Sequence, residues 1–151
     1  IESFNFYVMD TVKHILQRKG NLVYTVCPDT SVYEALELLE EKNLGSLIVV
    51  EDDGKLHGIF TERDYSRKVI LKGRSSKETL VRDIMTESPI FVTPETEINE
   101  CMKLMTEKFI RHLPVLDNGK LIGLVSIGDL VNYIIYQKDF IIENLEHYIS
   151  S

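Results

Sequence analysis

The sequence predicts an α/β protein of the α+β sandwich type, built from two copies of a β-α-β-β-α unit and ending in a long helix. Three observations support this class. Similar segments recur in both halves, each half has an amphipathic helical stretch after a short strand, and each has a two-residue hairpin signal. The chain has 151 residues, of which 44% are hydrophobic, and this is enough apolar material for a compact core.

The recurring segments lie at matching positions of the two halves. VCPDT at 26–30 returns as VTPET at 92–96, and GKLHG at 54–58 returns as GKLIG at 119–123. Recurrence of several segments in the same order indicates a duplicated structural unit. The sequence therefore predicts two repeats that fill most of the chain.

Each repeat is expected to contain a helix that follows a short strand. The strands are predicted around 24–26 and 90–92. Apolar residues at positions i, i+3, i+4 and i+7 then predict one buried face on each helix. The residues with this spacing are Val32, Ala35, Leu36 and Leu39 in the first repeat and Ile98, Cys101, Met102 and Met105 in the second.

A β-hairpin and a closing helix are expected next in each repeat. The dipeptides DG at 53–54 and NG at 118–119 lie between apolar runs. Such dipeptides favour type I′ turns, in which both central residues have positive φ. The closing helices are expected to begin near Asp64 and Asp129.

The segment 72–77 is polar and contains a glycine, which is typical of an exposed connection. We therefore divide the chain into five parts at this segment and at the ends of the repeats. The parts are an N-terminal extension, either native or left over from cloning (1–10), a first repeat (11–73), a linker (74–80), a second repeat (81–137) and a C-terminal helix extension (138–151).

Composition limits the classes of function. The formal net charge of −7 disfavours binding to nucleic acid or to anionic membranes, because both depend on many Lys and Arg residues. No apolar run approaches the roughly 20 residues of a membrane span, and the first eight residues lack the features of a signal peptide. Cys27 and Cys101 have no Cys or His at metal-ligand spacing. We therefore expect a cytoplasmic protein without a membrane span or a metal site.

Four motifs carry a resemblance to a known family. They are GIFTERD at 58–64, IMT at 84–86, IRHLPV at 110–115 and GLVSIGD at 123–129. In these motifs the chain resembles the CBS-domain family, in the stand-alone prokaryotic form of its tandem pair, the Bateman module. The resemblance implies two units related by a pseudo-twofold axis, with two nucleotide clefts between their sheets. It also implies a regulatory adenine-nucleotide ligand, AMP foremost, with ADP, ATP, NAD(H) and S-adenosylmethionine as alternatives, and no required cofactor.

The first ligand-binding candidates are a hydroxyl and a carboxylate at the start of each closing helix. Thr61 and Asp64, and likewise Ser126 and Asp129, are spaced to meet on the first helical turn. There a carboxylate can accept hydrogen bonds from ribose hydroxyls, and free backbone N–H groups favour a phosphate. The same spacing is typical of an ordinary helix cap. The two roles are compatible, because a carboxylate has several acceptor positions.

The candidates for phosphate binding are Arg63 and the adjacent pair Arg111 and His112. A guanidinium fork beside a titratable imidazole suits a phosphate, and the resemblance implies phosphate contacts at this pair. The resemblance also implies that Met85 lies near the adenine. Pro114, which follows in the same strand, completes the ligand-binding candidates.

The two repeats differ at the positions that matter for ligand charge. At the positions equivalent to Arg111 and His112, the first repeat has only a glycine and a serine, at 45–46. We therefore expect one strongly basic cleft that combines Thr61–Asp64 with Arg111–His112. The other cleft, built on Ser126 and Asp129, is expected to have little positive charge.

The motifs and the apolar pattern of the chain also bear on its class of function. An enzyme is not expected, because the sequence has no nucleophile elbow, Walker loop, HExxH motif or paired Cys-His signature. The alternative to a nucleotide-binding module is a structural or RNA-binding adaptor that uses the basic stretch 63–77. Apolar residues crowd the stretch 129–148, so we expect a homodimer through the closing helices. We also expect an unidentified partner protein that receives the signal.

Overall fold

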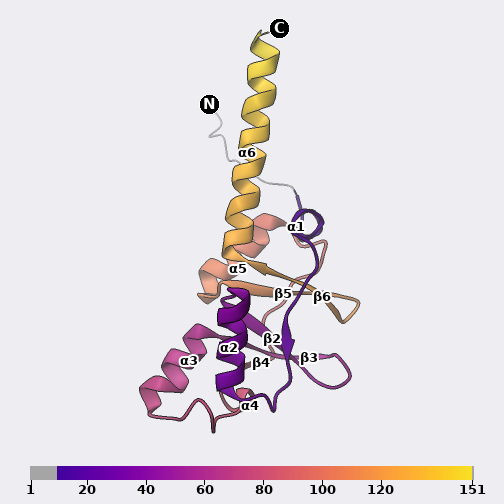
Figure 1. The fold of residues 1–151 in the computed structure, drawn as a ribbon. Coiled ribbons are helices and arrows are strands. Elements are labelled where there is room, and N and C mark those ends of the chain that lie inside the picture. The colour runs from indigo at the N-terminus through magenta and orange to yellow at the C-terminus, as the bar shows by residue number, and fades with distance from the viewer. Residues whose placement is uncertain (1–9, 151) are drawn as a thin grey trace.

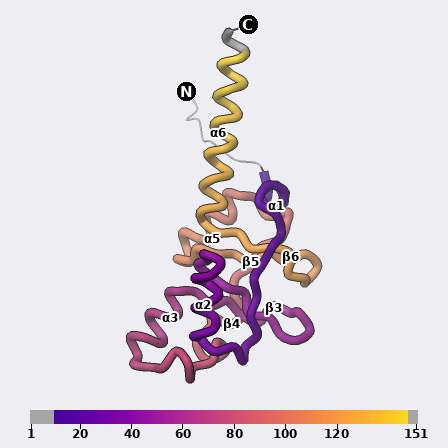
Figure 2. The backbone as a smooth tube through the Cα atoms, viewed as in Figure 1, coloured from indigo at the N-terminus to yellow at the C-terminus, as the bar shows by residue number. Residues whose placement is uncertain are grey.

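The computed structural model describes residues 10–150, with side chains for residues 10–147 (Figures 1 and 2). Most of the expected N-terminal extension therefore lies outside the described residues. In chain order the elements are α1 (Val12–Lys19), β1 (Thr25–Val26), α2 (Val32–Lys42), β2 (Ser46–Val50), β3 (Leu56–Thr61), α3 (Glu62–Lys68), the 3₁₀ turn η1 (Ile70–Lys72), α4 (Val81–Ile84), β4 (Thr86–Glu87), α5 (Ile98–Lys108), β5 (His112–Asp117), β6 (Lys120–Ser126) and α6 (Ile127–Ser150).

The strands form two separate sheets. The first has the order β1-β2-β3-β4, in which β1 is parallel to β2 and the other neighbours are antiparallel. The second is the antiparallel pair β5-β6. The predicted mixed α/β class with a hairpin in each half is confirmed.

The strand expected at the start of the second repeat is reduced to a single bridge, in which Val92 lies parallel to Val115. In the first repeat the ladder extends further, because the N–H of Ile48 donates to the carbonyl oxygen of Tyr24. The register places Pro114 where the first repeat has Ile48. Proline has no N–H to donate, so the ladder stops at Val92.

The two hairpin turns differ. Asn118 and Gly119 both have positive φ, 51° and 81°, as a type I′ turn requires. In the first hairpin Gly54 has a φ of 80°, its N–H donates to the carbonyl oxygen of Glu51, and Asp53 has no positive φ. The type I′ prediction is therefore wrong for the first turn. An extra residue makes a longer loop, with glycine in its left-handed position.

The fold has two buried cores, one in each repeat. Each core also includes a short helix that belongs, by sequence, to the other repeat. The core of α2, β2 and β3 also contains Val81 and Ile84 of α4. The core of α5, β5, β6 and α6 also contains Val12 and Ile15 of α1. Figure 2 shows α1 beside the start of α6, far from the sheet that follows it in sequence. This packing interlocks the two repeats.

Two glycines allow the interlocking helices to approach closely. A Cβ atom at Gly58 would lie 2.7 Å from Sδ of Met85 and 2.8 Å from the carbonyl oxygen of Thr86. A Cβ atom at Gly123 would lie 2.8 Å from Cδ2 of Leu16. Met85 and Leu16 thus take equivalent places, each over the glycine of the opposite repeat.

The closing helices begin slightly before the predicted residues. α3 begins at Glu62 and α6 at Ile127, because Thr61 and Ser126 precede them as capping residues. Figure 1 shows α6 projecting well beyond the rest of the molecule. Among the described residues, no helix has both the length and the apolar character needed to cross a membrane.

Candidate functional site

Thr61 and Asp64 form a reciprocal cap at the junction of β3 and α3. The N–H of Thr61 donates to Oδ2 of Asp64 over 3.0 Å, and the N–H of Asp64 donates to Oγ1 of Thr61 over 3.2 Å. The carboxylate is buried, since Asp64 is only 7% exposed. The two predicted partners therefore lie together, with the carboxylate fixed by the backbone.

The second carboxylate oxygen of Asp64 faces a lysine and a threonine. Nζ of Lys68 lies 3.0 Å from Oδ1, and Oγ1 of Thr86 lies 3.5 Å from the same oxygen. Lys68 also donates to the carbonyl oxygen of Ile84 over 3.0 Å. The lysine belongs to the same helix as Asp64, one turn later. A ribose hydroxyl that binds Oδ1 has to share this oxygen with Lys68 or displace it.

Ser126 and Asp129 repeat the cap at the junction of β6 and α6. The N–H of Ser126 donates to Oδ2 of Asp129 over 2.8 Å, and the N–H of Asp129 donates to Oγ of Ser126 over 3.1 Å. The capping interpretation thus holds at both junctions. It leaves Oδ1 of each carboxylate outside the cap.

A cation that the sequence analysis missed also lies at Asp129. Lys19, the last residue of α1, places Nζ 2.6 Å from Oδ2 of Asp129 and 2.8 Å from the carbonyl oxygen of Leu124. The expectation of little positive charge at this junction is therefore wrong. No local motif marks Lys19, because its role depends on α1 packing against the opposite repeat.

Arg63 connects the two repeats. Its Nη1 donates to the carbonyl oxygen of Phe109 over 2.9 Å. Phe109 ends α5 in the left-handed conformation, with a φ of 54°, and lies two residues before Arg111. The structure thus brings one predicted phosphate-binding residue of the first repeat to the segment that carries the other two.

His112 lies between the repeats. Its Nε2 is 3.2 Å from the position that a Cβ atom of Gly45 would take, and its Cα pairs with that of Ser126. Burial lowers the pKa of His112 below its ordinary value of 6.5; Arg111 and Lys19 lower it further, whereas Asp129 opposes the shift. The imidazole is therefore neutral at pH 7, and its charged neighbours place it beside the Asp129 junction.

The other predicted site residues lie in different environments. Arg111 is exposed, whereas Met85 and Pro114 are buried. Met85 packs in the core of the first repeat against Gly58. Pro114 lies inside β5, where it pairs with Leu124. Any ligand contact of these two residues therefore has to come from the small part of their surface that the core leaves open.

Ser46 is a polar residue that the sequence analysis did not include among the ligand-binding candidates. It is 3% exposed, and its Oγ has no hydrogen-bond partner among the described residues. Its Cα pairs with that of Thr61, and it directly follows Gly45, which contacts His112. Buried hydroxyls are almost always hydrogen-bonded, so this one points to a ligand or water between the repeats. A serine at a strand start has no sequence pattern that distinguishes it.

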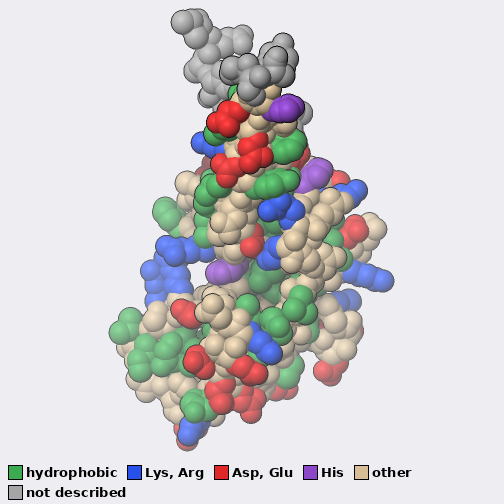
Figure 3. All heavy atoms as spheres, turned by 45° about the horizontal axis from the view of Figure 1, so that its top comes forward, with side chains coloured by type: hydrophobic (Ala, Val, Ile, Leu, Met, Phe, Trp, Pro, Cys, Tyr) green, Lys and Arg blue, Asp and Glu red, His purple; other side chains and the backbone are tan. Residues whose placement is uncertain are grey.

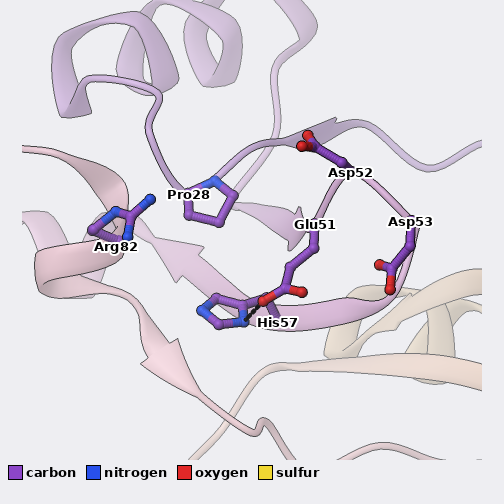
Figure 4. Close-up of a pocket in the computed structure, with 6 residues that line it drawn as sticks. All are labelled: Pro28, Glu51, Asp52, Asp53, His57 and Arg82. Carbon is purple, nitrogen blue, oxygen red and sulfur yellow. Dashed lines mark ion pairs between the residues drawn. The ribbon is translucent and has the colours of Figure 1, made fainter.

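Two pockets lie away from these residues. Figure 4 shows the first, of about 400 Å³, beside the β2-β3 turn; Nδ1 of His57 lies 2.8 Å from Oε1 of Glu51 there. Carboxylates predominate in it, which makes it unsuited to a phosphate. The second pocket, of about 370 Å³, lies between α1 and α6. Neither is lined by a predicted site residue.

Comparisons with known proteins agree with this arrangement of two halves. The family model described as CBS domain matches twice, over residues 12–70 and 81–136. The CBS domain-containing protein CBSX3, mitochondrial, of Arabidopsis thaliana is 42% identical over 147 residues, which are 92% of this chain and 71% of the relative. The solved structure of the CBS domain NE2398 has a TM-score of 0.80 and 49% identity, covering 83% of this chain and 98% of that one. CBSX2 in complex with AMP has a TM-score of 0.70 and 35% identity, covering 85% and 98%.

Proposed function

Because the chain belongs to the CBS-domain family and carries two copies of the domain, we propose that it is a regulatory module that binds an adenine nucleotide. The nucleotide binds between the repeats, and its presence is signalled to a partner protein. AMP is the foremost ligand, and ADP, ATP, NAD(H) and S-adenosylmethionine share the adenosine group that the site recognises. The module catalyses no reaction itself.

The observation that carries this proposal is the hydroxyl of Ser46, for which the residues described in the structure offer no hydrogen-bond partner. A buried polar group without a partner costs about 1–3 kcal/mol of stability. A ligand oxygen that bonds to this hydroxyl removes the cost, and the hydroxyl lies beside Thr61 in the β2-β3 register. The capped carboxylates Asp64 and Asp129 supply acceptors for ribose, one at each strand–helix junction.

The AMP complex of CBSX2 supports the choice of ligand class, since that protein has the same fold and is 35% identical. Arg63, Arg111, Lys19 and Lys68 are the cations that the described residues place at or near the two junctions. So few cations balance the charge of a ligand with one or two phosphates. The Asp64 and Asp129 sites are therefore matched to a nucleotide.

A thermal-shift panel of the five adenosine ligands tests the proposal. A ligand at a hundred times its Kd stabilises the folded state by about 2.7 kcal/mol, which raises the midpoint of a chain of this size by roughly 5–10 °C. We expect AMP to give the largest shift and guanosine 5′-monophosphate to give none. The absence of a shift with every adenosine ligand at millimolar concentration would overturn the proposal.

The structure gives little support to an RNA-binding adaptor. Within the basic stretch 63–77, Arg63 is bonded to Phe109, Lys68 is paired with Asp64, and Lys77 lies over the ring of Tyr33. On the face drawn in Figure 3, basic side chains form separate small groups among acidic ones. RNA binding uses a continuous basic surface, so salt-sensitive RNA binding without any response to AMP is the outcome that would favour the adaptor.

The proposed module acts as a homodimer, with α6 as the contact between copies. This helix, whose later turns project from the body in Figure 1, exposes large apolar side chains along much of its length. They are Val131, Ile135, Tyr136, Phe140, Ile141, Ile142 and Leu145. Exposed apolar surface of this extent is typical of a protein interface. The identity of the regulated partner and a cytoplasmic location stay predictions from the sequence.

A further inference from the structure

The ion pair between Lys19 and Asp129 joins two residues that are 110 positions apart in sequence. The side chains are 33% and 22% exposed, so a ligand can reach both. The same Nζ is anchored on the carbonyl oxygen of Leu124 in β6. Lys19 is therefore held by one hydrogen bond to the Asp129 carboxylate and one to the carbonyl oxygen of Leu124.

The Asp64 carboxylate is held differently. Its lysine, Lys68, lies four residues later on the same helix. The residue four positions after Asp129 is Tyr133, whose hydroxyl donates to Asp10 instead. The Asp129 junction thus has no lysine of its own helix at this position, and its cation comes from α1.

This arrangement affects how a ribose can bind. A ribose diol can bind Oδ1 of Asp129, because the cap and Lys19 both use Oδ2. An uncharged nucleoside bound there gives the neighbouring ammonium of Lys19 no anionic group of its own to bind. A 5′-phosphate, attached beside the ribose ring, gives the same ammonium a new charge-assisted hydrogen bond.

The other basic groups near Asp129 do not replace Lys19 in this role. Burial keeps the pKa of His112 below its ordinary value, so its ring is neutral at pH 7. Arg111 is exposed to solvent, where its attraction to a phosphate is weakened by screening. Lys19 is the cation in direct contact with the carboxylate.

We propose that Lys19 makes the Asp129 site selective for phosphorylated adenosine ligands over adenosine. The proposal rests on the proposed function, because it concerns one of the two nucleotide sites. Through Lys19, helix α1 of the first repeat contributes a side chain to the Asp129 site of the second repeat.

Site-resolved NMR titration with AMP and with adenosine tests the proposal. The amide of Gly128 reports on the Asp129 junction, and the amide of Arg63 reports on the Asp64 junction. The variants are Lys19→Met, Lys19→Arg and, as a control on the same helix, the exposed Lys13→Met. Lys19→Arg keeps the positive charge and guards against a general effect of substitution on folding.

In the wild type, AMP is expected to bind at the Gly128 probe at least about tenfold more tightly than adenosine, the effect of one charge-assisted hydrogen bond. Lys19→Met should bring the two affinities close together, and Lys19→Arg and Lys13→Met should keep the preference. The Arg63 probe should respond equally in all variants.

Two results would overturn the proposal while leaving nucleotide binding intact. One is an unchanged ratio of AMP to adenosine affinity in Lys19→Met, and the other is an equal loss for both ligands. Failure of every amide to respond to AMP in the wild type overturns the proposed function, and this proposal with it. The two failures are therefore distinguishable.

Discussion

Nη1 of Arg63 donates a 2.9 Å hydrogen bond to the carbonyl oxygen of Phe109, and this bond spans the boundary between the repeats. Arg63 lies in the first turn of α3, two residues after the capping residue Thr61. Phe109 lies at the end of α5, where helical carbonyl groups lack partners within the helix. A side chain of the proposed nucleotide site therefore also connects the two halves.

Replacing Arg63 by methionine is expected to lower AMP affinity about tenfold, because a charged partner of the phosphate is lost. The loss of stability should be below about 1 kcal/mol, since the side chain is exposed. Calorimetric titration and urea unfolding measure the two quantities. Arg67→Met, an exposed arginine on the same helix, serves as the control. A tenfold loss in the control as well would show that the effect is not specific to Arg63.

The lowered pKa of His112 predicts a pH dependence of stability. The unfolded chain takes up a proton on this histidine near pH 6.5, whereas the folded chain takes it up only at lower pH. The unfolded state thus binds more protons in this window, and stability falls as the pH drops below about 6.5. Urea unfolding from pH 7.5 to 5 should show a smaller decrease for His112→Asn than for the wild type. Parallel curves for the two proteins would rule out this role of His112.

The two close-packed glycines are expected to differ in their tolerance of alanine. At Gly58 the added Cβ meets the backbone carbonyl of Thr86, which cannot move aside. At Gly123 it meets only the end of the Leu16 side chain, which can change rotamer. Gly58→Ala should therefore cost about 1–3 kcal/mol of unfolding free energy, and Gly123→Ala clearly less.

Urea unfolding of both alanine variants measures the difference. Gly128→Ala is the matched control, because its Cβ would lie at an ordinary distance, 3.6 Å from Oγ of Ser126. A larger loss at Gly123 than at Gly58 would contradict the packing described for α4.

The apolar face of α6 predicts a dimer, and a negatively charged substitution on this face is expected to disrupt it. Val131, Ile135, Ile142 and Leu145 follow the alternating spacing of a helix–helix seam, with Lys138 at the position between the two pairs. Ile135→Asp should convert a dimer into a monomer at micromolar concentration in light scattering. Asn132→Asp, which adds the same charge on an exposed position outside the seam, should remain dimeric. A monomeric wild type would exclude this interface.

The sequence predicted the central helix, the hairpin and the closing helix of each half, because duplicated motifs and regular periodicity mark them locally; it did not predict α1, α4 or β4. It also predicted the pairs Thr61 with Asp64 and Ser126 with Asp129, since capping depends on residues three positions apart. The sequence did not indicate that α1 packs on the opposite repeat, because no local pattern states which core an amphipathic helix joins. Lys19 was missed at Asp129 for this reason.

The burial of Ser46 was not predicted for a related reason. Its side chain is unusual only in its surroundings: it is buried, and within the described part of the chain its hydroxyl has no hydrogen-bond partner. The deciding information for Ser46 is three-dimensional. The difference between the hairpin turns has another origin, because one additional residue, visible in the sequence, changes a loop that carries the same dipeptide signal.

Calorimetric titration of AMP into the wild type and Ser46→Ala tests the central claim most directly. We expect saturable AMP binding to the wild type and about tenfold weaker binding to the variant, which loses a buried hydroxyl partner of the ligand. Without ligand, Ser46→Ala should be at least as stable as the wild type, because the unpaired group is removed. Absence of AMP binding by the wild type, or equal binding by both proteins, would contradict a nucleotide site at the Ser46 position.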